Sequence, residues 1–208
     1  MKSGRFLALF AVAAVAAGST AALALQDKGK EAKPASAKPD DPMMAKWAEF
    51  ATPGADHKVL EAKVGKWNDK VTCWMTPDAP PMEATGTSEI KWILGNRFLQ
   101  GTTKGDFGGQ PFDGMGTFGF DNMKKKYVSS WVDNMGTGIM MAEGTYDAGT
   151  KTFTYTGEGP DVMSGKYAPV KSTEKMVDKD NWVCEMWCTD AKSGKLFKSM
   201  EIKSTRAK

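Results

Sequence analysis

The chain has 208 residues, of which 28 are basic and 25 acidic, with one histidine and three cysteines. This balanced charge argues against nucleic acid as a partner, because nucleic acid requires a basic face. A single histidine also argues against an imidazole-based zinc site, which needs several such ligands.

The first 25 residues (1–25) have the pattern of a secretory signal peptide. Lys2 and Arg5 precede an apolar run from Phe6 to Ala17, and small residues follow up to Ala22-Leu23-Ala24. A basic start, an apolar centre and an A-x-A-type site are typical of a cleaved export signal. The apolar run is short for a membrane span. We therefore expect a secreted or periplasmic protein with no membrane span after signal cleavage, and an uncleaved anchor is the alternative.

A linker and a short helical segment are predicted next. Residues 26–42 contain Lys, Pro, Ala and Asp but no large apolar side chain, which indicates a disordered linker before a single domain at 43–208. Within residues 43–63, apolar side chains recur at helical spacing, with a break at Thr52-Pro53-Gly54. Asp56 is placed to cap the second helical piece.

From residue 65 onward the apolar residues recur with period two, which is the spacing of β-strands. Turns that contain Gly, Asn or Asp separate the runs. Ten strands are predicted, at 65–75, 82–94, 97–104, 111–120, 126–133, 138–146, 151–157, 168–178, 181–189 and 195–206. This meander predicts an all-β fold, a ten-stranded antiparallel up-and-down barrel of the lipocalin type, with a two-sheet sandwich as the alternative.

Two glycine motifs and the histidine have plain structural interpretations. Gly114 to Gly119 spell G-x-G-x-x-G, but a strand follows instead of the helix that dinucleotide binding needs. The glycines more simply relieve crowding where the strand bends sharply, or leave room for Phe118 and Phe120. The Gly65-x-Trp67 pair opens the first strand, and we expect its tryptophan to plug one end of the barrel. For His57, a cap or surface role is favoured over catalysis, because it lacks an orienting partner.

Four blocks of the sequence resemble a bacterial family of unknown function, number 1579. They are the opening L-x-x-x-V-G-x-W (60–67), KWILGNRFLQ (91–100), the segment 111–138 and the closing KSMEIKSTR (198–206). The resemblance covers roughly residues 57–206 and implies a lipocalin-like barrel. It implies no reaction and no catalytic residue, because the family has no established catalytic set.

A closed barrel is a container, and this one should have a lumen rich in Met and Trp. Flexible methionine walls suit variable apolar ligands, and tryptophan at a mouth suits a flat one. We predict a small apolar or amphipathic ligand in the lumen, lined by Trp92, Arg97, Trp131 and Met140. Arg97 has two interpretations: it anchors an anionic head group, or it forms an ion pair with a glutamate at the rim, which is favoured.

Two other functions are kept as alternatives. The first is a packed barrel that acts as a structural or interaction domain without a ligand. The second, which is less favoured, is an enzyme at the barrel mouth with Asp133 or Glu143 as general base. No catalytic residue, cofactor or metal site is predicted, and the oligomeric state stays open.

The pairing of the three cysteines also stays open. Cys184 and Cys188 lie on one predicted strand, where four residues span about 13 Å, beyond the reach of a disulfide. Cys73 could pair with either of them if the first strand lay beside the ninth, or across the lumen. At least one thiol therefore stays unpaired within the chain.

Overall fold

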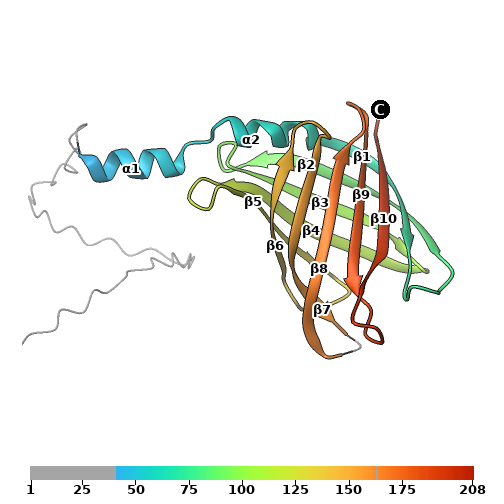
Figure 1. Cartoon of the computed structure of the whole chain (residues 1–208). Coiled ribbons are helices and arrows are strands. Elements are labelled where there is room, and N and C mark those ends of the chain that lie inside the picture. Colours follow the sequence, from blue (N-terminus) through green and yellow to red (C-terminus); the bar gives the residue numbers. More distant parts are fainter. Residues whose placement is uncertain (1–40, 163) are drawn as a thin grey trace, which may run out of the picture. The chain divides into compact units, whose positions relative to one another are not determined.

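Ten antiparallel strands close into a barrel in this computed structural model, which describes residues 41–162 and 164–208 (Figure 1). Each strand pairs with its neighbours in sequence, and the first strand pairs with the last. This closure confirms the predicted barrel and excludes the two-sheet sandwich. The strands are β1 (Gly65–Cys73), β2 (Met82–Ile93), β3 (Phe98–Phe107), β4 (Gln110–Asp121), β5 (Lys126–Asp133), β6 (Met140–Asp147), β7 (Thr152–Asp161), β8 (Lys166–Met176), β9 (Asn181–Thr189) and β10 (Leu196–Arg206).

From residue 41 onward, three short helical elements precede the barrel: α1 (Pro42–Ala51), α2 (Ala55–Val59) and the 3₁₀ helix η1 (Leu60–Lys63). The two-piece helical segment is thus confirmed. The predicted signal peptide and the linker as far as residue 40 lie outside the described residues. Asp41 and Pro42, which were assigned to the linker, instead cap and begin α1. The reason is that Asp41 Oδ1 accepts the N–H of Met43 at 2.9 Å, and proline suits the first helical position.

The cap of α2 differs from the prediction. Gly54, not Asp56, is the N-cap residue. Nδ1 of His57 accepts the backbone N–H of Gly54 at 3.1 Å, and the imidazole packs edge-on against Phe120. His57 therefore has the cap role that the sequence favoured, and it is buried.

The helices and the turns 94–97, 122–125, 148–151 and 177–180 lie at one end of the barrel, which we call the helical end. Trp67 plugs this end as predicted, with no exposed surface. Its Nε1–H donates to the carbonyl of Lys63 at 3.0 Å. The guanidinium of Arg206 lies 4.2 Å from the centre of its ring, and Nη1 of Arg206 donates to the carbonyl of Val64. Arg206 of β10 thereby holds the start of β1 in place.

A buried ion pair lies just inside the helical end. The ammonium group of Lys63, which is 1% exposed, contacts the carboxylate of Glu174. The same ammonium lies 4.1 Å from the centre of the Phe118 ring and 5.4 Å from that of Phe153. A buried charge is tolerated only when it is paired, so Lys63 can stay buried only because Glu174 pairs with it.

The three cysteines are free thiols in the described chain. The reason is the strand order: β1 lies between β2 and β10, so Cys73 is two strands away from β9. Two strand spacings are about 10 Å, which exceeds the Cα separation of a disulfide. Burial raises the pKa of the Cys73 thiol to about 11.

Of the helices in the described residues, none combines the length and apolar character needed to cross a membrane.

Candidate ligand-binding site in the barrel lumen

The lumen has two unlike halves. Near the helical end, inward side chains such as Leu60, Leu99 and Phe153 are buried at 1% exposure or less. We call the other end, which carries the turns 108–109, 134–139 and 190–195, the open end. There the inward side chains of β5 to β9 are only half-buried, and they include Ser129, Trp131, Ala142, Val170, Ser172 and Met186.

A small cavity of about 40 Å³ lies in the open half. Its lining comes from β5 to β9 and consists of Ser129, Trp131, Met140, Ala142, Tyr155, Val170, Lys171, Ser172 and Met186. One water needs at least about 10–15 Å³ of such volume, so the cavity holds a few waters at most. A site for a drug-sized molecule usually encloses several hundred Å³. The barrel's own side chains therefore fill most of the lumen in this conformation.

Trp131 forms one wall of the cavity and is held in place on several sides. Its ring covers Gly116 closely, since a Cβ there would lie only 3.0 Å from Cε3 of the indole. Nε1 donates to Oδ2 of Asp133 at 2.8 Å, and the ring is nearly parallel to that of Phe112, with centroids 6.4 Å apart. Gly114 and Gly116 thus make room for Trp131, and Gly119 makes room for Phe98. Of the two rings that the sequence suggested, Phe118 lies at ordinary contact distance from Gly116.

Tyr155 is the notable polar group at the inner boundary of the cavity. The residue is 1% exposed, and among the described residues its hydroxyl has no hydrogen-bond partner. Burial, with a smaller contribution from the charge of Glu174, raises its pKa well above the usual value, so the hydroxyl stays protonated. A buried polar group left unpaired costs about 1–3 kcal/mol. A water or a ligand acceptor at this point would remove that cost.

The four predicted lining residues are found in different places. Trp131 and Met140 line the cavity. Trp92 lies near the helical end, where its Nε1–H contacts the carboxylate of Glu61. Arg97 is exposed in the β2–β3 turn and donates to the carbonyls of Leu94 at 3.2 Å and Gly95 at 3.4 Å.

The favoured ion pair of Arg97 is not found in the part of the chain that the structure describes. The turn carbonyls take the place of a carboxylate, because the chain curls back beneath the guanidinium. Tyr155 was not among the predicted lining residues, although its phase on a period-two strand places it inward together with Phe153. That Trp92, Arg97, Trp131 and Met140 bind a ligand stays a prediction.

The two candidate general bases are both occupied. Glu143 lies outside the barrel, where the ammonium groups of Lys124 and Lys126 contact its carboxylate and lower its pKa. Asp133 accepts hydrogen bonds from Trp131 and from the backbone N–H of Met135 at 3.0 Å. Neither carboxylate is directed at a cavity as a free base. Within residues 41–162 and 164–208, no group of three His, Cys, Asp or Glu is arranged to hold a metal ion.

Solved structures of other proteins share this fold, among them these two. One is the crystal structure of Rv2717c from M. tuberculosis, at 14% identity and a TM-score of 0.58, covering 76% of this chain and 100% of that one. The other is the S-type phycobiliprotein lyase CPES from Guillardia theta, at 10% identity and a TM-score of 0.56, covering 78% and 97%. Similarity at such low identity shows the fold alone.

The sequence comparison agrees with the resemblance noted in the sequence. No curated protein sequence matches the chain. Residues 52–206, which include every strand of the barrel, match the profile of a family described as proteins of unknown function (DUF1579). The chain therefore belongs to the DUF1579 family.

Proposed function

We propose that this protein binds a small apolar or amphipathic molecule in the open half of its barrel lumen. The observation that carries the proposal is the Tyr155 hydroxyl, a buried donor without a partner among the described residues, on a residue that lines the cavity. The other walls are mainly apolar, with Trp131, Met140 and Met186 as the large side chains. An apolar pocket with a few polar groups that fix orientation is the usual form of a small-molecule site.

The cavity of about 40 Å³ requires that a ligand displaces side chains. Met140 and Met186 are suited to this, because methionine is unbranched and adopts many rotamers at low cost. Trp131 is less suited, since Asp133 and Phe112 hold it. We therefore expect a ligand that is small, flat against Trp131 and equipped with one acceptor for the Tyr155 hydroxyl.

The shared fold supports a container role in a limited way. One neighbour is named as a phycobiliprotein lyase, so the same barrel occurs in a protein named for small-molecule chemistry. At 10% identity this supports the architecture of the site and not the identity of a ligand.

The test begins with native mass spectrometry of the purified protein, compared with its denatured mass. A discrete excess mass that is lost on denaturation supports the proposal and gives the mass of the ligand. In parallel, Ala142→Leu places a larger side chain in the cavity wall. We expect it to weaken binding of the probe anilinonaphthalene sulfonate by about tenfold, because it removes the volume that the probe needs.

A matched control is Ala148→Leu, the same change at an exposed turn position. Circular dichroism and thermal unfolding verify that both variants fold. Equal native and denatured masses, together with equal probe binding by both variants, contradict a lumenal ligand.

One observation favours a second function. The small cavity suits a packed barrel that acts as a structural or interaction domain. The same experiments decide between the two, since a packed barrel shows no excess mass and no dependence on Ala142.

We also propose that the protein acts outside the cytoplasm, secreted or periplasmic. The basis is the signal-like pattern of residues 1–25. Intact mass measurement of the protein recovered from an exporting host tests this: loss of about the first 25 residues is expected, and an uncleaved chain contradicts it.

A further inference from the structure

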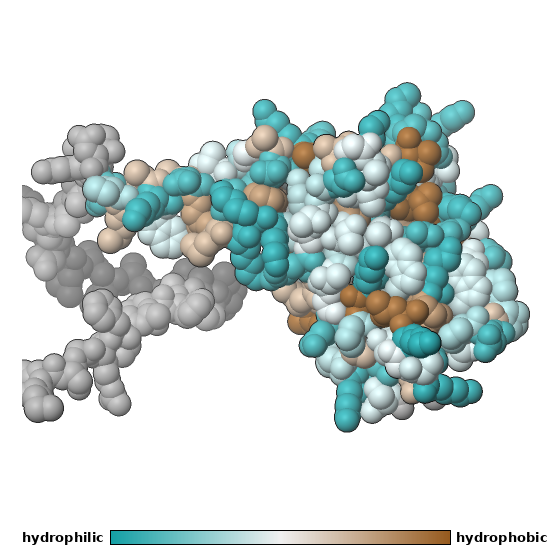
Figure 2. All heavy atoms as spheres, in the orientation of Figure 1, coloured by the Kyte–Doolittle hydropathy of each residue, from teal (hydrophilic) through white to brown (hydrophobic). Residues whose placement is uncertain are grey.

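The first helix exposes a broad apolar face. Residues of α1 are exposed along its whole length, and none is buried. Its large apolar side chains are Met43 (65% exposed), Met44 (47%), Trp47 (60%) and Phe50 (43%). At 3.6 residues per turn these four lie on one side, Lys46 lies at the edge of that side, and Glu49 lies on the opposite side. Figure 2 shows apolar side chains of this helix at the surface.

Among the described residues, hydrogen bonds fasten α1 to the barrel at its last turn. Nδ2 of Asn122, in the β4–β5 turn, donates to the carbonyls of Phe50 and Thr52, both at 2.9 Å. Isolated helices shorter than about 12–15 residues are marginal in water, because few hydrogen bonds offset the cost of nucleation. A ten-residue helix with an uncovered apolar face therefore gains stability from a surface that covers it.

Two turns at the helical end, the β4–β5 turn that fastens α1 and the nearby β2–β3 turn, each expose an apolar residue that a cation follows in sequence. In the β4–β5 turn, Met123 is 77% exposed and Lys125 follows it. In the β2–β3 turn, Leu94 is 69% exposed and Arg97 follows it. Each turn thus presents an apolar side chain next to a cation.

The backbone of the β2–β3 turn makes this arrangement unusual. Leu94 has a φ of 51°, a left-handed conformation that non-glycine residues rarely adopt. Turns of this kind favour Gly, Asn or Asp, for which the conformation costs least. A solvent-exposed leucine in this position therefore contributes no packing that would offset the strain.

We infer that α1 and these two turns form a binding surface for an anionic lipid bilayer. The surface consists of Met43, Met44, Trp47 and Phe50 of α1, with Leu94 and Met123 at the turn tips. A helix with Trp and Phe on its apolar face lies in the headgroup region of a bilayer, and anionic lipids attract cations beside it. Lys46, Arg97 and Lys125 supply those cations. This inference is independent of the lumenal ligand.

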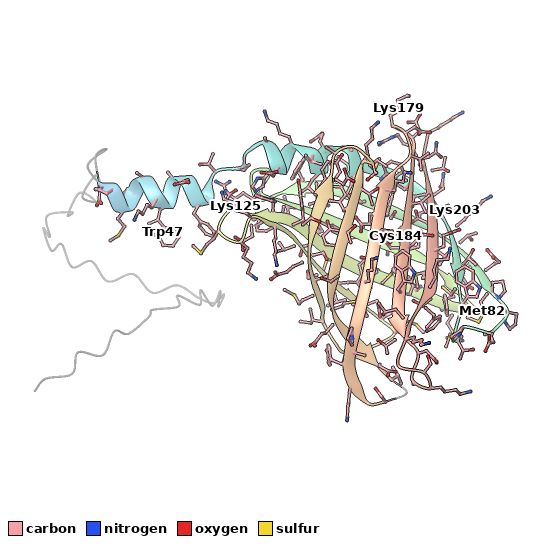
Figure 3. All side chains as sticks on the ribbon, in the orientation of Figure 1. Trp47, Met82, Lys125, Lys179, Cys184 and Lys203 are labelled. Atoms are coloured by element: carbon pink, nitrogen blue, oxygen red, sulfur yellow. The ribbon has the colours of Figure 1, made fainter. Side chains whose placement is uncertain are left out.

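The charges of the surface support a bilayer over a protein partner. Lys125 has no ion pair among the described residues, whereas Lys124 and Lys126 both contact Glu143. Figure 3 labels Lys125 at the hairpin that fastens α1 and Trp47 on the helix. The apolar side chains lie on a helix face and at two turn tips and do not form a pocket. A bilayer accepts such separate protrusions, because it adapts its surface to each of them.

The experiment is co-sedimentation with lipid vesicles. It uses the full chain and a chain that starts at Pro39, since Pro39–Lys208 is one compact unit that contains the entire barrel and its core. One set of vesicles is pure phosphatidylcholine, and in the other roughly one lipid in three is phosphatidylglycerol, which gives an anionic surface. We expect the shorter chain to bind the anionic vesicles, and added salt to weaken the binding.

Two variants with matched controls locate the surface. Trp47→Glu should weaken binding to anionic vesicles by about tenfold or more, because it replaces a large apolar side chain that would enter the bilayer with a negative charge. Met141→Glu, the same kind of change at a 61% exposed position on the barrel wall, should leave binding unchanged. Lys125→Gln should weaken it by about fivefold, which corresponds to one cation near an anionic surface, and Lys192→Gln in the β9–β10 turn should not.

Three outcomes overturn the inference. The first is that the shorter chain binds neither kind of vesicle. The second is that Trp47→Glu and Met141→Glu bind alike. The third is that light scattering shows a dimer of the shorter chain that Trp47→Glu dissociates, which assigns the helix face to a second copy. Circular dichroism verifies that each variant folds.

Discussion

The two ends of the barrel are built from the same strands but packed in different ways. At the helical end, Trp67, Leu60 and Leu99 are fully buried, and an ion pair is enclosed among aromatic rings. At the open end, the inward side chains are half-buried methionine, serine and valine, with one small cavity between them. The difference indicates that stability resides in the helical end. The open end retains the freedom to rearrange that a binding site needs.

The largest expected effect tests the buried ion pair. Glu174→Leu leaves the ammonium of Lys63 buried without a partner, which should lower the free energy of unfolding by about 3–5 kcal/mol. The double variant Lys63→Met with Glu174→Leu removes both charges and should recover most of this loss. Urea unfolding followed by circular dichroism measures both.

The exposed pair of Lys124 and Glu143 serves as the control. Lys124→Met should leave the free energy of unfolding nearly unchanged, because water screens the pair. Equal losses for Glu174→Leu and Lys124→Met would show that the buried ion pair contributes no more to the free energy of unfolding than the exposed pair.

A second prediction compares one apolar side chain from each end. Leu99→Ala creates a cavity in the packed half and should cost about 2–4 kcal/mol. Met186→Ala, at a half-buried position of the open half, should cost about 1 kcal/mol, because its surroundings are already partly open. Chemical denaturation of both variants provides the comparison. If Met186→Ala is as costly as Leu99→Ala, the open half is as tightly packed as the helical half, which contradicts the division.

The fold could be predicted from the sequence because a sheet with one solvated face imposes alternation on every strand. Closure into a barrel was harder to predict than the strands themselves. It depends on the pairing of β1 with β10, which are far apart in sequence. The same pairing decides the state of the thiols, since it places β10 between Cys73 and the two cysteines of β9.

The candidate site could be predicted only in part. The inward phase of Trp131 and Met140 follows from alternation, and both line the cavity. The unpaired hydroxyl of Tyr155 depends on which side chains meet it inside the barrel, and alternation carries no information about that. Arg97 lies next to a turn whose carbonyls it contacts, and the turn's backbone path cannot be read from residue types.

A third prediction concerns the clamp between the chain's last strand and its first. Arg206→Ala removes a cation stacked on Trp67 and hydrogen bonds to the carbonyls of Val64 and Lys179. We expect a loss of about 1–2 kcal/mol, because the cation–π contact and a bond to a partly buried carbonyl each contribute about 1 kcal/mol. Arg206→Lys should recover little, since an ammonium cannot reach both carbonyls from one stacked position. Thermal unfolding of both variants measures the effect, and full recovery by lysine would contradict the stacked geometry.

The smallest expected effect is a pH dependence at the helical end. Burial lowers the pKa of His57 below its ordinary value of 6.5, and the nearby carboxylate of Asp56 offsets this only in part. The unfolded chain therefore binds the proton more readily than the folded chain. Stability from this group should be complete above pH 6.5 and should decline as the pH falls toward the lowered pKa.

His57→Asn tests this dependence, because an amide oxygen can accept the Gly54 N–H without titrating. We expect the variant to lose less stability than the unmodified protein when unfolding is measured between pH 7 and pH 5. A change at the open end, such as Met186→Ala, should leave the slope of stability with pH unaltered. If both variants flatten that slope equally, the dependence does not arise from the helix cap. The acid sensitivity would then have to be assigned to groups other than the buried carboxyl of Asp69, whose pKa is raised by burial. That shift has the opposite sign, since it makes the folded state the better proton acceptor, so stability from Asp69 declines as the pH rises through its window. A loss of stability as the pH falls therefore points to the helix cap at His57 and not to Asp69.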